Sequence, residues 1–284
     1  MNDGKHAPEA AFLWAMIPKE AQIRIRICAM NKNSLPSALG FVLVGALLTG
    51  CAAPRPKTSA VPPQRTAITS TNDEPVTPRE IIYAASLKPL SLVAGDGWRS
   101  LFDGSSLDGW GVTHFGGDGR VELRERLLVF GIGAPFTGVN YTNALPKLNY
   151  EVTLEAMRIE GDDFFCGLTF PVGDSFLSLI VGGWGGRIVG ISSLDDSDAS
   201  DNETTQLMDF ETGRWYRIRL HVTEQKIEAW IDQKQLVNVM TTEHKLSLRA
   251  GDIELSKPFG LASWVTGAAY RDIKIRSIPS DPAE

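Results

Sequence analysis

Residues 214–223 read Arg-Trp-Tyr-Arg-Ile-Arg-Leu-His-Val-Thr, and this stretch decides the fold. From Tyr216 to Val222 every second side chain is apolar, and arginines and a histidine occupy the positions between them. A period of two is typical of a β-strand with one buried face. Segments 226–232 and 235–240 follow after the turns 224–225 and 233–234. Three strands joined by tight turns predict an antiparallel meander.

The same pattern extends outward along the chain. In residues 150–159 the even positions from Tyr150 to Ala156 are apolar and are expected inside, and the odd ones are polar and expected outside. Residues 164–170 and 176–181 are continuously apolar, as in central strands covered on both faces. Residues 267–278 are expected to form the closing strand. Short strands with glycine turns predict an all-β fold, a two-sheet antiparallel sandwich. We expect a concanavalin A-like jelly roll with one curved sheet forming a groove.

The N-terminal part carries an export signal. An apolar run from Leu39 to Leu48 ends in Leu-Thr-Gly-Cys at residues 48–51, the pattern of a bacterial lipoprotein signal peptide. We expect Cys51 to carry lipid and to anchor the chain to the membrane of the bacterial cell envelope. Ala52 after the cysteine favours the outer membrane, with the domain facing the periplasm or the cell surface. The alternative is a buried helix that ends in Thr-Gly-Cys by chance.

Composition divides the chain into five segments. Residues 1–29 are unlike a leader, so we interpret them as a mis-called N-terminal extension and residues 30–50 as the signal peptide. Residues 51–90 are rich in Pro, Ser and Thr and are predicted to be a disordered tether. Residues 91–279 are long enough for a core of their own and are predicted to be the jelly-roll domain. Residues 280–284 form a tail.

Charge and cysteine content exclude several classes of protein. The net charge is −6 and the positive residues are scattered, which argues against a nucleic-acid partner. With Cys28 in the extension and Cys51 as the lipid site, Cys166 has no partner, so we expect a buried free thiol. The histidines do not lie at ligand spacing, which argues against a zinc site.

Residues 98–110 read Trp-Arg-Ser-Leu-Phe-Asp-Gly-Ser-Ser-Leu-Asp-Gly-Trp, which resembles the opening signature of the 3-keto-disaccharide hydrolase domain family. Residues 259–261 (Phe-Gly-Leu) and 270–276 (Tyr-Arg-Asp-Ile-Lys-Ile-Arg) look like the closing strands of that family, and residues 211–232 resemble its middle hairpin. The resemblance covers residues 91–278. It implies a concanavalin A-like jelly roll, a carbohydrate substrate or ligand, and cleavage of sugars oxidised at the third carbon.

Three segments depart from the family pattern. Residues 165–171 lack the Asn and the Arg of the matching family strand, residues 175–179 lack its carboxylate, and Trp264 stands at the position of a late histidine. Three functions therefore stay open. The chain is a glycoside-active enzyme, a non-catalytic carbohydrate-binding jelly roll, or a structural envelope lipoprotein.

Few residues suit sugar cleavage, which needs a carboxyl pair or, for a 3-keto sugar, one base and a cation that stabilises the enolate. Asp163 precedes a central strand and is the predicted base. Arg271 shares the parity of Ile273 and Ile275, so we expect it to point inward as the cation or to pair with a carboxylate. Asp174 is a weaker candidate for substrate binding. For both aspartates the alternative is a solvated turn.

Residues 195–203 read Asp-Asp-Ser-Asp-Ala-Ser-Asp-Asn-Glu and offer several hard oxygen ligands in one loop. Asp196, Asp198 and Asp201 are candidate calcium ligands. The alternative is a plain solvated acidic loop. No other cofactor is indicated.

Tryptophans are candidate sugar platforms, because indole rings stack on the apolar face of a sugar. Trp184 lies between two glycine pairs, and Trp230 falls on the polar face of its strand. Together with Trp264 they are the predicted substrate-binding residues, with core or rim packing as the alternative for each. We expect the remaining tryptophans of the domain, Trp98, Trp110 and Trp215, to anchor the core or a hairpin.

Overall fold

The computed structural model describes residues 75–280. Cys51, the signal peptide and most of the predicted tether lie outside the described residues. Within this range no helix has the length and apolar character needed to span a membrane.

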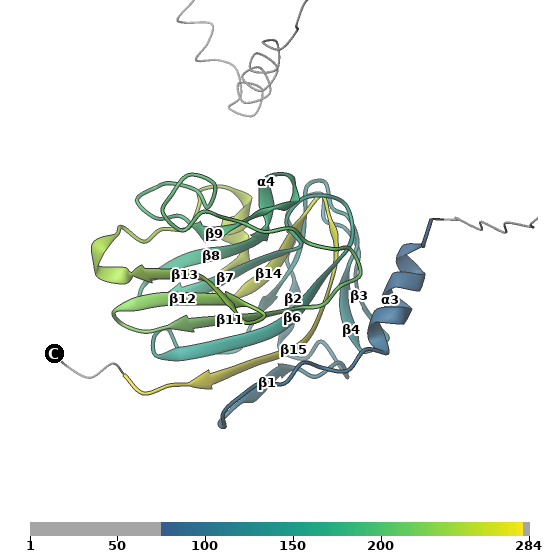
Figure 1. Cartoon of the computed structure of the whole chain (residues 1–284), viewed down its shortest axis with the longest axis horizontal. Helices are drawn as coiled ribbons and strands as arrows, with labels where there is room; N and C mark the ends of the chain where they lie inside the picture. The colour runs from purple at the N-terminus through teal and green to yellow at the C-terminus, as the bar shows by residue number, and fades with distance from the viewer. Residues whose placement is uncertain (1–74, 281–284) are drawn as a thin grey trace, which may run out of the picture. The chain divides into compact units, whose positions relative to one another are not determined.

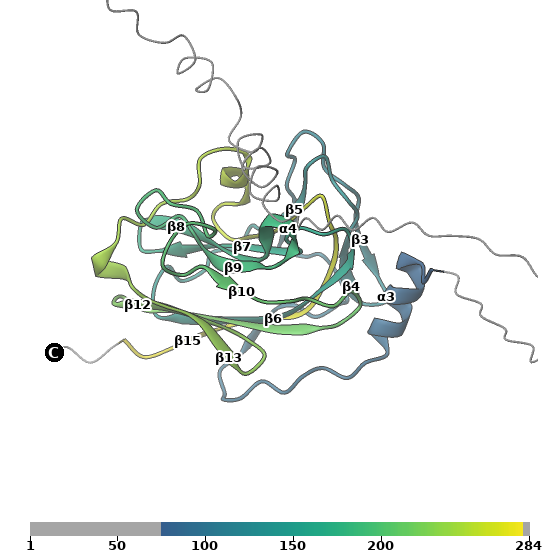
Figure 2. The ribbon, with the colours of Figure 1, turned by 45° about the horizontal axis from the view of Figure 1, so that its top comes forward.

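The described chain forms two antiparallel sheets that make two layers (Figures 1 and 2). The eight-stranded sheet, called sheet A, contains, in spatial order, β13 (Lys234–Met240), β12 (Lys226–Ile231), β11 (Tyr216–Val222), β6 (Tyr150–Glu160), β15 (Gly267–Ser277), β4 (Leu127–Phe130) and β3 (Val121–Arg124), with β1 (Arg99–Phe102) paired to β15. The seven-stranded sheet B contains β10 (Gln206–Leu207), β9 (Ile188–Ser192), β8 (Ser175–Gly182), β7 (Cys166–Val172), β14 (Gly260–Trp264), β5 (Phe136–Tyr141) and β2 (Trp110–Val112). The short helical segments are α3 (Pro78–Ser86), α4 (Gly183–Gly186), η1 (Thr241–Glu243) and η2 (Asp252–Ser256).

The strand β11 has the predicted alternation. Its apolar positions from Tyr216 to Val222 are buried in the core between the sheets, and β12 and β13 complete the meander beside it. On its other side β11 pairs with β6, whose even positions from Tyr150 to Ala156 are buried in the same core. The predicted two-sheet antiparallel sandwich of jelly-roll type is confirmed.

Two buried tyrosines connect the layers. The hydroxyl of Tyr150 in sheet A donates to the carbonyl of Pro171 in sheet B at 2.6 Å, and that of Tyr270 donates to the carbonyl of Phe165 at 2.7 Å. A buried hydroxyl without a partner is costly, so these bonds fix how the sheets face each other. Cys166 lies in the same core as the predicted free thiol, and burial raises its pKa above the usual range.

Part of the predicted tether is folded, so the prediction for its last residues is wrong. The helix α3 begins with a capping box between Thr77 and Glu80 and has proline in its first turn. Its buried residues Ile82 and Ala85 pack in a small cluster on the outer face of sheet A, where Trp215 donates to the carbonyl of Ala85 at 2.9 Å. The average composition of residues 51–90 is that of a linker, but the nine residues of α3 carry their own helix signals.

The groove expected on one sheet is filled in sheet B. Thr169 and Ser178 face away from the core in the middle of this sheet, yet both are buried and hydrogen-bond to each other at 2.8 Å. Beside them, Ala262 is covered by Ile253 of η2. The segment 197–205 lies on β9 so closely that a Cβ on Gly190 would come within 2.9 Å of a carbonyl oxygen. Loops distant in sequence therefore cover this face, and the groove prediction is wrong for sheet B.

Replacing Ile82 with alanine tests whether α3 belongs to the domain. Ile82 is 3% exposed, so the Ile82→Ala variant should lose about 2–4 kcal/mol in urea unfolding, or should expose residues 75–98 to protease. Tyr83 on the same helix is 58% exposed, and Tyr83→Ala should change stability by no more than about 0.5 kcal/mol. Two variants as stable and protease-resistant as the native chain would mean that α3 is a tether after all.

Candidate functional site

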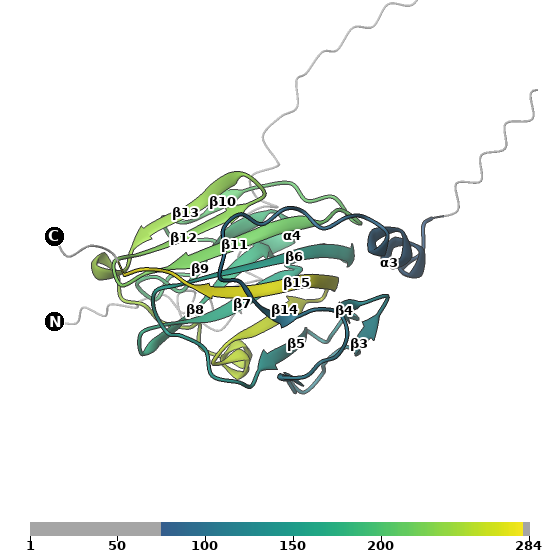
Figure 3. The ribbon, with the colours of Figure 1, turned by 90° about the horizontal axis from the view of Figure 1, so that it is seen from below.

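The outer face of sheet A is charged and largely covered. Residues 87–98, called the strap, follow α3 and run across this face before entering β1 (Figure 3). Glu151 and Glu155 face away from the core as predicted, but the strap and neighbouring side chains bury them. The charged residues near the strap form ion pairs, most of them between strands, and they are Glu151, Glu155, Arg217, Arg219, Arg271, Asp272, Lys274 and Arg276.

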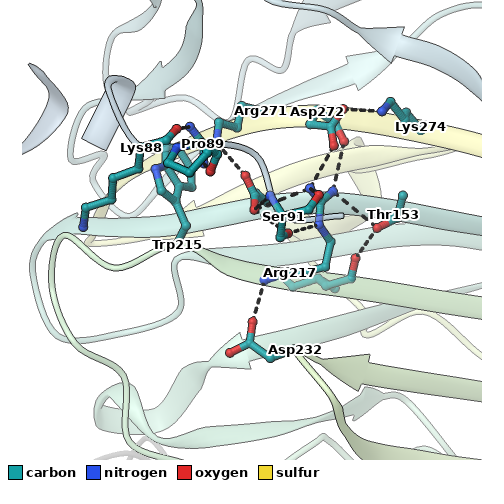
Figure 4. Close-up of polar contacts among 12 residues, drawn as sticks. Lys88, Pro89, Ser91, Thr153, Trp215, Arg217, Asp232, Arg271, Asp272 and Lys274 are labelled. Carbon is teal, nitrogen blue, oxygen red and sulfur yellow. Dashed lines mark hydrogen bonds and ion pairs between the residues drawn. The ribbon is translucent and has the colours of Figure 1, made fainter. Parts of the chain in front are cut away.

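Glu155 is the centre of these contacts. Its Oε1 accepts from the backbone N–H and the hydroxyl of Ser91 at 3.0 and 2.6 Å, and its Oε2 accepts from Nε of Arg271 at 2.6 Å. Arg217 lies 3.4 Å from the same carboxylate and donates to Asp272 at 2.8 Å. Figure 4 shows Ser91 of the strap beside Arg217, with Asp272 bonded to the same guanidinium. Hydrogen bonds on both carboxylate oxygens offset the cost of burying the charge.

Arg271 points outward, so the prediction of an inward side chain is wrong. The ladder between β15 and β6 shifts register just after Arg271, and Asp272 has a φ of 53°. This bulge reverses the alternation, so Ile273 faces the core while Arg271 faces the strap. There Arg271 donates to the carbonyls of Lys88 and Pro89 at 2.8 and 2.9 Å. Its donors are used for structure.

A cleft of about 190 Å³ lies between the strap and strands β11 and β12. Its walls include Trp98 of the strap and Trp230 of β12, and Arg219 lies beside them. The guanidinium of Arg219 is 3.9 Å from the centre of the Trp230 ring, and that of Arg276 is 4.5 Å from the centre of the Trp98 ring. These cation–π contacts hold both indoles in place.

The carboxylates of the cleft already have cationic partners. Glu151 accepts from Arg276 at 2.7 Å. Asp232 accepts from Arg214 at 2.7 Å and from the backbone N–H of Arg217 at 3.0 Å. Each keeps lone pairs that can accept from a ligand hydroxyl.

A second group of predicted residues meets in the loop between β6 and β7. Asp163 accepts from the backbone N–H groups of Phe164, Trp184 and Gly185 at 2.7, 3.2 and 3.3 Å. Burial raises the pKa of Asp163, and these backbone bonds oppose the shift. Trp184 is 37% exposed with a φ of 50°, so the α4 turn presents its ring at the surface. Trp264 stacks at an angle on Phe164, with ring centres 6.4 Å apart.

An arginine that the sequence did not single out lies near this loop. Arg158 is buried and donates to the carbonyl of Gly186 at 2.9 Å, and its Nε has no partner among the described residues. Burial lowers its pKa, although Asp162 and Asp163 both favour its charged form. A carboxylate of the loop and a guanidinium of β6 therefore lie near each other in a partly buried setting.

The acidic loop contacts cations of the chain. Asp196 lies 2.7 Å from Nζ of Lys245, and Asp198 lies 3.5 Å from Nε of Arg249. In the part of the chain that the structure describes, no group of three or more metal-binding side chains converges. Calcium binding by Asp196, Asp198 and Asp201 stays a prediction.

The family model of the 3-keto-α-glucoside-1,2-lyase-like domain matches residues 97–276, more than half of the chain. The chain belongs to this family. The resemblance that begins at Trp98 is thereby confirmed. The match starts inside the strap and ends with β15, so the lyase-like domain includes Trp98 and Trp230 of the cleft and Asp163 of the loop.

Solved structures similar to the lyase-like domain are distant in sequence. The carbohydrate-binding module CBM66 from Bacillus subtilis is 12% identical, with a TM-score of 0.40 over 60% of this chain and 96% of its own. A Bacillus subtilis protein of unknown function with a galectin-like fold is also 12% identical, with a TM-score of 0.43 over 62% of this chain and 92% of its own. No protein with a curated description matches this sequence.

The predicted site residues of the lyase-like domain fall into separate places. Asp163, Trp184 and Trp264 gather at one loop, whereas Arg271 is held beneath the strap and Trp230 lines the cleft. Asp174 is a solvent-exposed turn residue that lies 3.1 Å from Lys147. The predicted base Asp163 and the predicted cation Arg271 therefore share no contact, and Arg271 pairs with the carboxylate of Glu155.

Sequence reasoning missed Trp98 and Arg219. Trp98 was expected to anchor the core or a hairpin, but it lies in the strap and donates to the carbonyl of Ala94 at 3.1 Å. One signal was present in the sequence: Arg217, Arg219 and His221 occupy one face of the strand from Tyr216 to Val222. Charged side chains on a strand that becomes buried need hydrogen-bond or ion-pair partners, and the strap supplies some of them through Ser91.

The stability of an Asp163→Asn variant should report the burial of this carboxylate. The pKa of Asp163 is higher in the folded chain than in the unfolded chain. Its stabilising contribution to the free energy of unfolding is therefore complete below the unfolded pKa of about 3.9, and it is lost as pH rises through the folded pKa. Asparagine does not titrate, so native minus variant melting temperature should fall as pH rises from about 3.5 to 7.

The exposed Asp174→Asn change controls for the loss of one surface carboxylate. A native-minus-variant difference for Asp163 that rises over this pH range would contradict the assignment.

Proposed function

We propose that this domain binds carbohydrate in the cleft between the strap and β12, and that it acts as a binding module. Membership of the lyase-like family supports a carbohydrate ligand. Trp98 and Trp230 offer the apolar walls on which sugar rings pack, and the charged side chains beside them offer hydrogen-bond partners for hydroxyls.

The observation that favours binding over cleavage is the state of the carboxylates in the cleft. Hydrolysis of a glycosidic bond requires one carboxyl to donate a proton and another to accept one or to attack. Glu151 and Asp232 are each held by an arginine at 2.7 Å, which favours acceptance of hydroxyl hydrogen bonds over proton transfer.

A second candidate is lyase or hydrolase activity on a 3-keto glycoside, as the family name implies. The raised pKa of Asp163 and the exposed ring of Trp184 favour it, because burial makes the carboxylate a stronger base for removing a proton next to a carbonyl. Turnover of a 3-keto-glucoside by the native chain, lost in Asp163→Asn, would establish this function in place of binding alone.

We also propose that lipid on Cys51 anchors the domain at the bacterial envelope, in the outer membrane. The sequence Leu-Thr-Gly-Cys after an apolar run supports the anchor. A Cys51→Ser variant found in the membrane fraction as fully as the native chain would contradict it.

The remaining alternative, a structural lipoprotein, predicts no saccharide binding at all.

Binding measured on a glycan array and by calorimetry tests the proposal. Trp230→Ala removes one wall of the cleft and the surface that supports Arg219, so affinity should fall by about tenfold or more. Trp184→Ala is the matched control, because it removes an exposed tryptophan outside the cleft, and should bind as the native chain does. Loss of binding in Trp184→Ala alone would place the ligand at the loop of Asp163.

A further inference from the structure

The face that carries the cleft has more positive than negative side chains. On this face of β6, β11, β12, β15 and the residues next to them, the ion-paired cations are Arg214, Arg217, Arg219, Lys226, Arg271, Lys274 and Arg276, and the ion-paired anions are Glu151, Glu155, Glu228, Asp232 and Asp272. Seven cations against five anions leave a surplus of two positive charges. The strap adds one charge of each sign, Lys88 and Asp96. The chain as a whole has a net charge of −6, so this face is opposite in sign to the rest.

Arg219 carries part of this positive charge to the solvent-exposed wall of the cleft. Arg217 and Arg271 are buried and donate to the strap and to carboxylates, whereas the side chain of Arg219 is 42% exposed. Its nearest carboxylate, Glu151, lies 3.6 Å away and is bound more closely by Arg276, at 2.5 Å. Within residues 75–280 the guanidinium of Arg219 makes no hydrogen bond.

The Trp230 ring fixes the orientation of that guanidinium. Arg219 and Trp230 are directly opposite in the pairing of β11 with β12, and the guanidinium lies 3.9 Å from the ring centre. A guanidinium that is stacked in this way keeps its N–H groups pointing outward along its own plane, and less conformational entropy is lost when they bind a planar anion. The fork of N–H groups matches a carboxylate in two parallel hydrogen bonds.

We infer that the cleft is selective for acidic saccharides, and that Arg219 binds the carboxylate of a uronic acid or the sulfate of a sulfated sugar. This inference rests on the proposed function, because it names the ligand class for the same cleft. Trp98 packs against the ring of that sugar, and Glu151 and Asp232 accept from its hydroxyls. A neutral sugar would leave the donors of Arg219 facing water.

Matched pairs of ligands test the charge separately from the ring. Oligogalacturonate, oligoglucuronate and sulfated galactan oligosaccharides are compared with the methyl esters of the first two and with unsulfated galactan oligosaccharides. The acidic members should bind at least about tenfold more tightly, and their affinity should fall as salt is raised. The uronate and sulfate arms show which anion is preferred.

Variants at Arg219 complete the test. Arg219→Gln should bring the affinity for the acidic oligosaccharide down to that for its methyl ester, and Arg219→Lys should restore part of the loss. Arg187 is 56% exposed and lies outside the cleft, so Arg187→Gln is the matched control and should bind normally. Melting temperatures near the native value show that each variant is folded.

The outcomes separate the inference from the proposed function. Equal binding of charged and methyl-esterified oligosaccharides, or an Arg219→Gln variant that keeps its preference for acid, would overturn acid selectivity while the cleft remains a saccharide site. Absence of binding by every oligosaccharide, charged or neutral, would overturn the proposed function itself.

Discussion

The buried carboxylate of Glu155 joins three parts of the chain that are far apart in sequence. It accepts from Ser91 of the strap and from Arg271 of β15, and Arg217 of β11 lies beside it. Removing one partner from a buried ion pair typically costs about 3–5 kcal/mol, because the other charge is left without compensation. Glu155 therefore helps to hold the strap, together with the bonds from Arg271 to Lys88 and Pro89 and from Arg217 to Ser91. The strap in turn supplies Trp98 to the cleft. The binding site that we propose depends on these contacts between the strap and sheet A.

The two-sheet fold could be predicted because its signals are local. Alternation from Tyr216 to Val222 and from Tyr150 to Ala156 identifies the buried face of each strand without knowledge of its neighbours. Short polar turns then predict that β11, β12 and β13 are adjacent. The lone Cys166 could be assigned as a free buried thiol by elimination. Each strand assignment needs about ten residues of sequence and no contact between distant segments.

The site could not be predicted to the same extent, because it is built from non-local contacts. A bulge at Asp272 reverses the alternation of β15, and nothing in the sequence marked that position, so Arg271 was assigned to the wrong face. The strap has the composition of a linker and is ordered by side chains more than 60 residues away, such as Glu155. On sheet B, η2 fills the expected groove with Ile253. Asp163 and Trp184 were each identified next to a turn, and their contact is a finding of the structure.

The two faces of the sandwich thus differ in what they offer a ligand. The outer face of sheet B is closed by loops, whereas sheet A keeps a cleft in which Arg219 lies on Trp230. The most direct test follows the indole N–H signals of the tryptophans by NMR during titration with an oligosaccharide that binds. We expect the signals of Trp98 and Trp230 to shift with ligand concentration while that of Trp184 stays in place. A shift of Trp184 with Trp98 and Trp230 unchanged would contradict binding in the cleft.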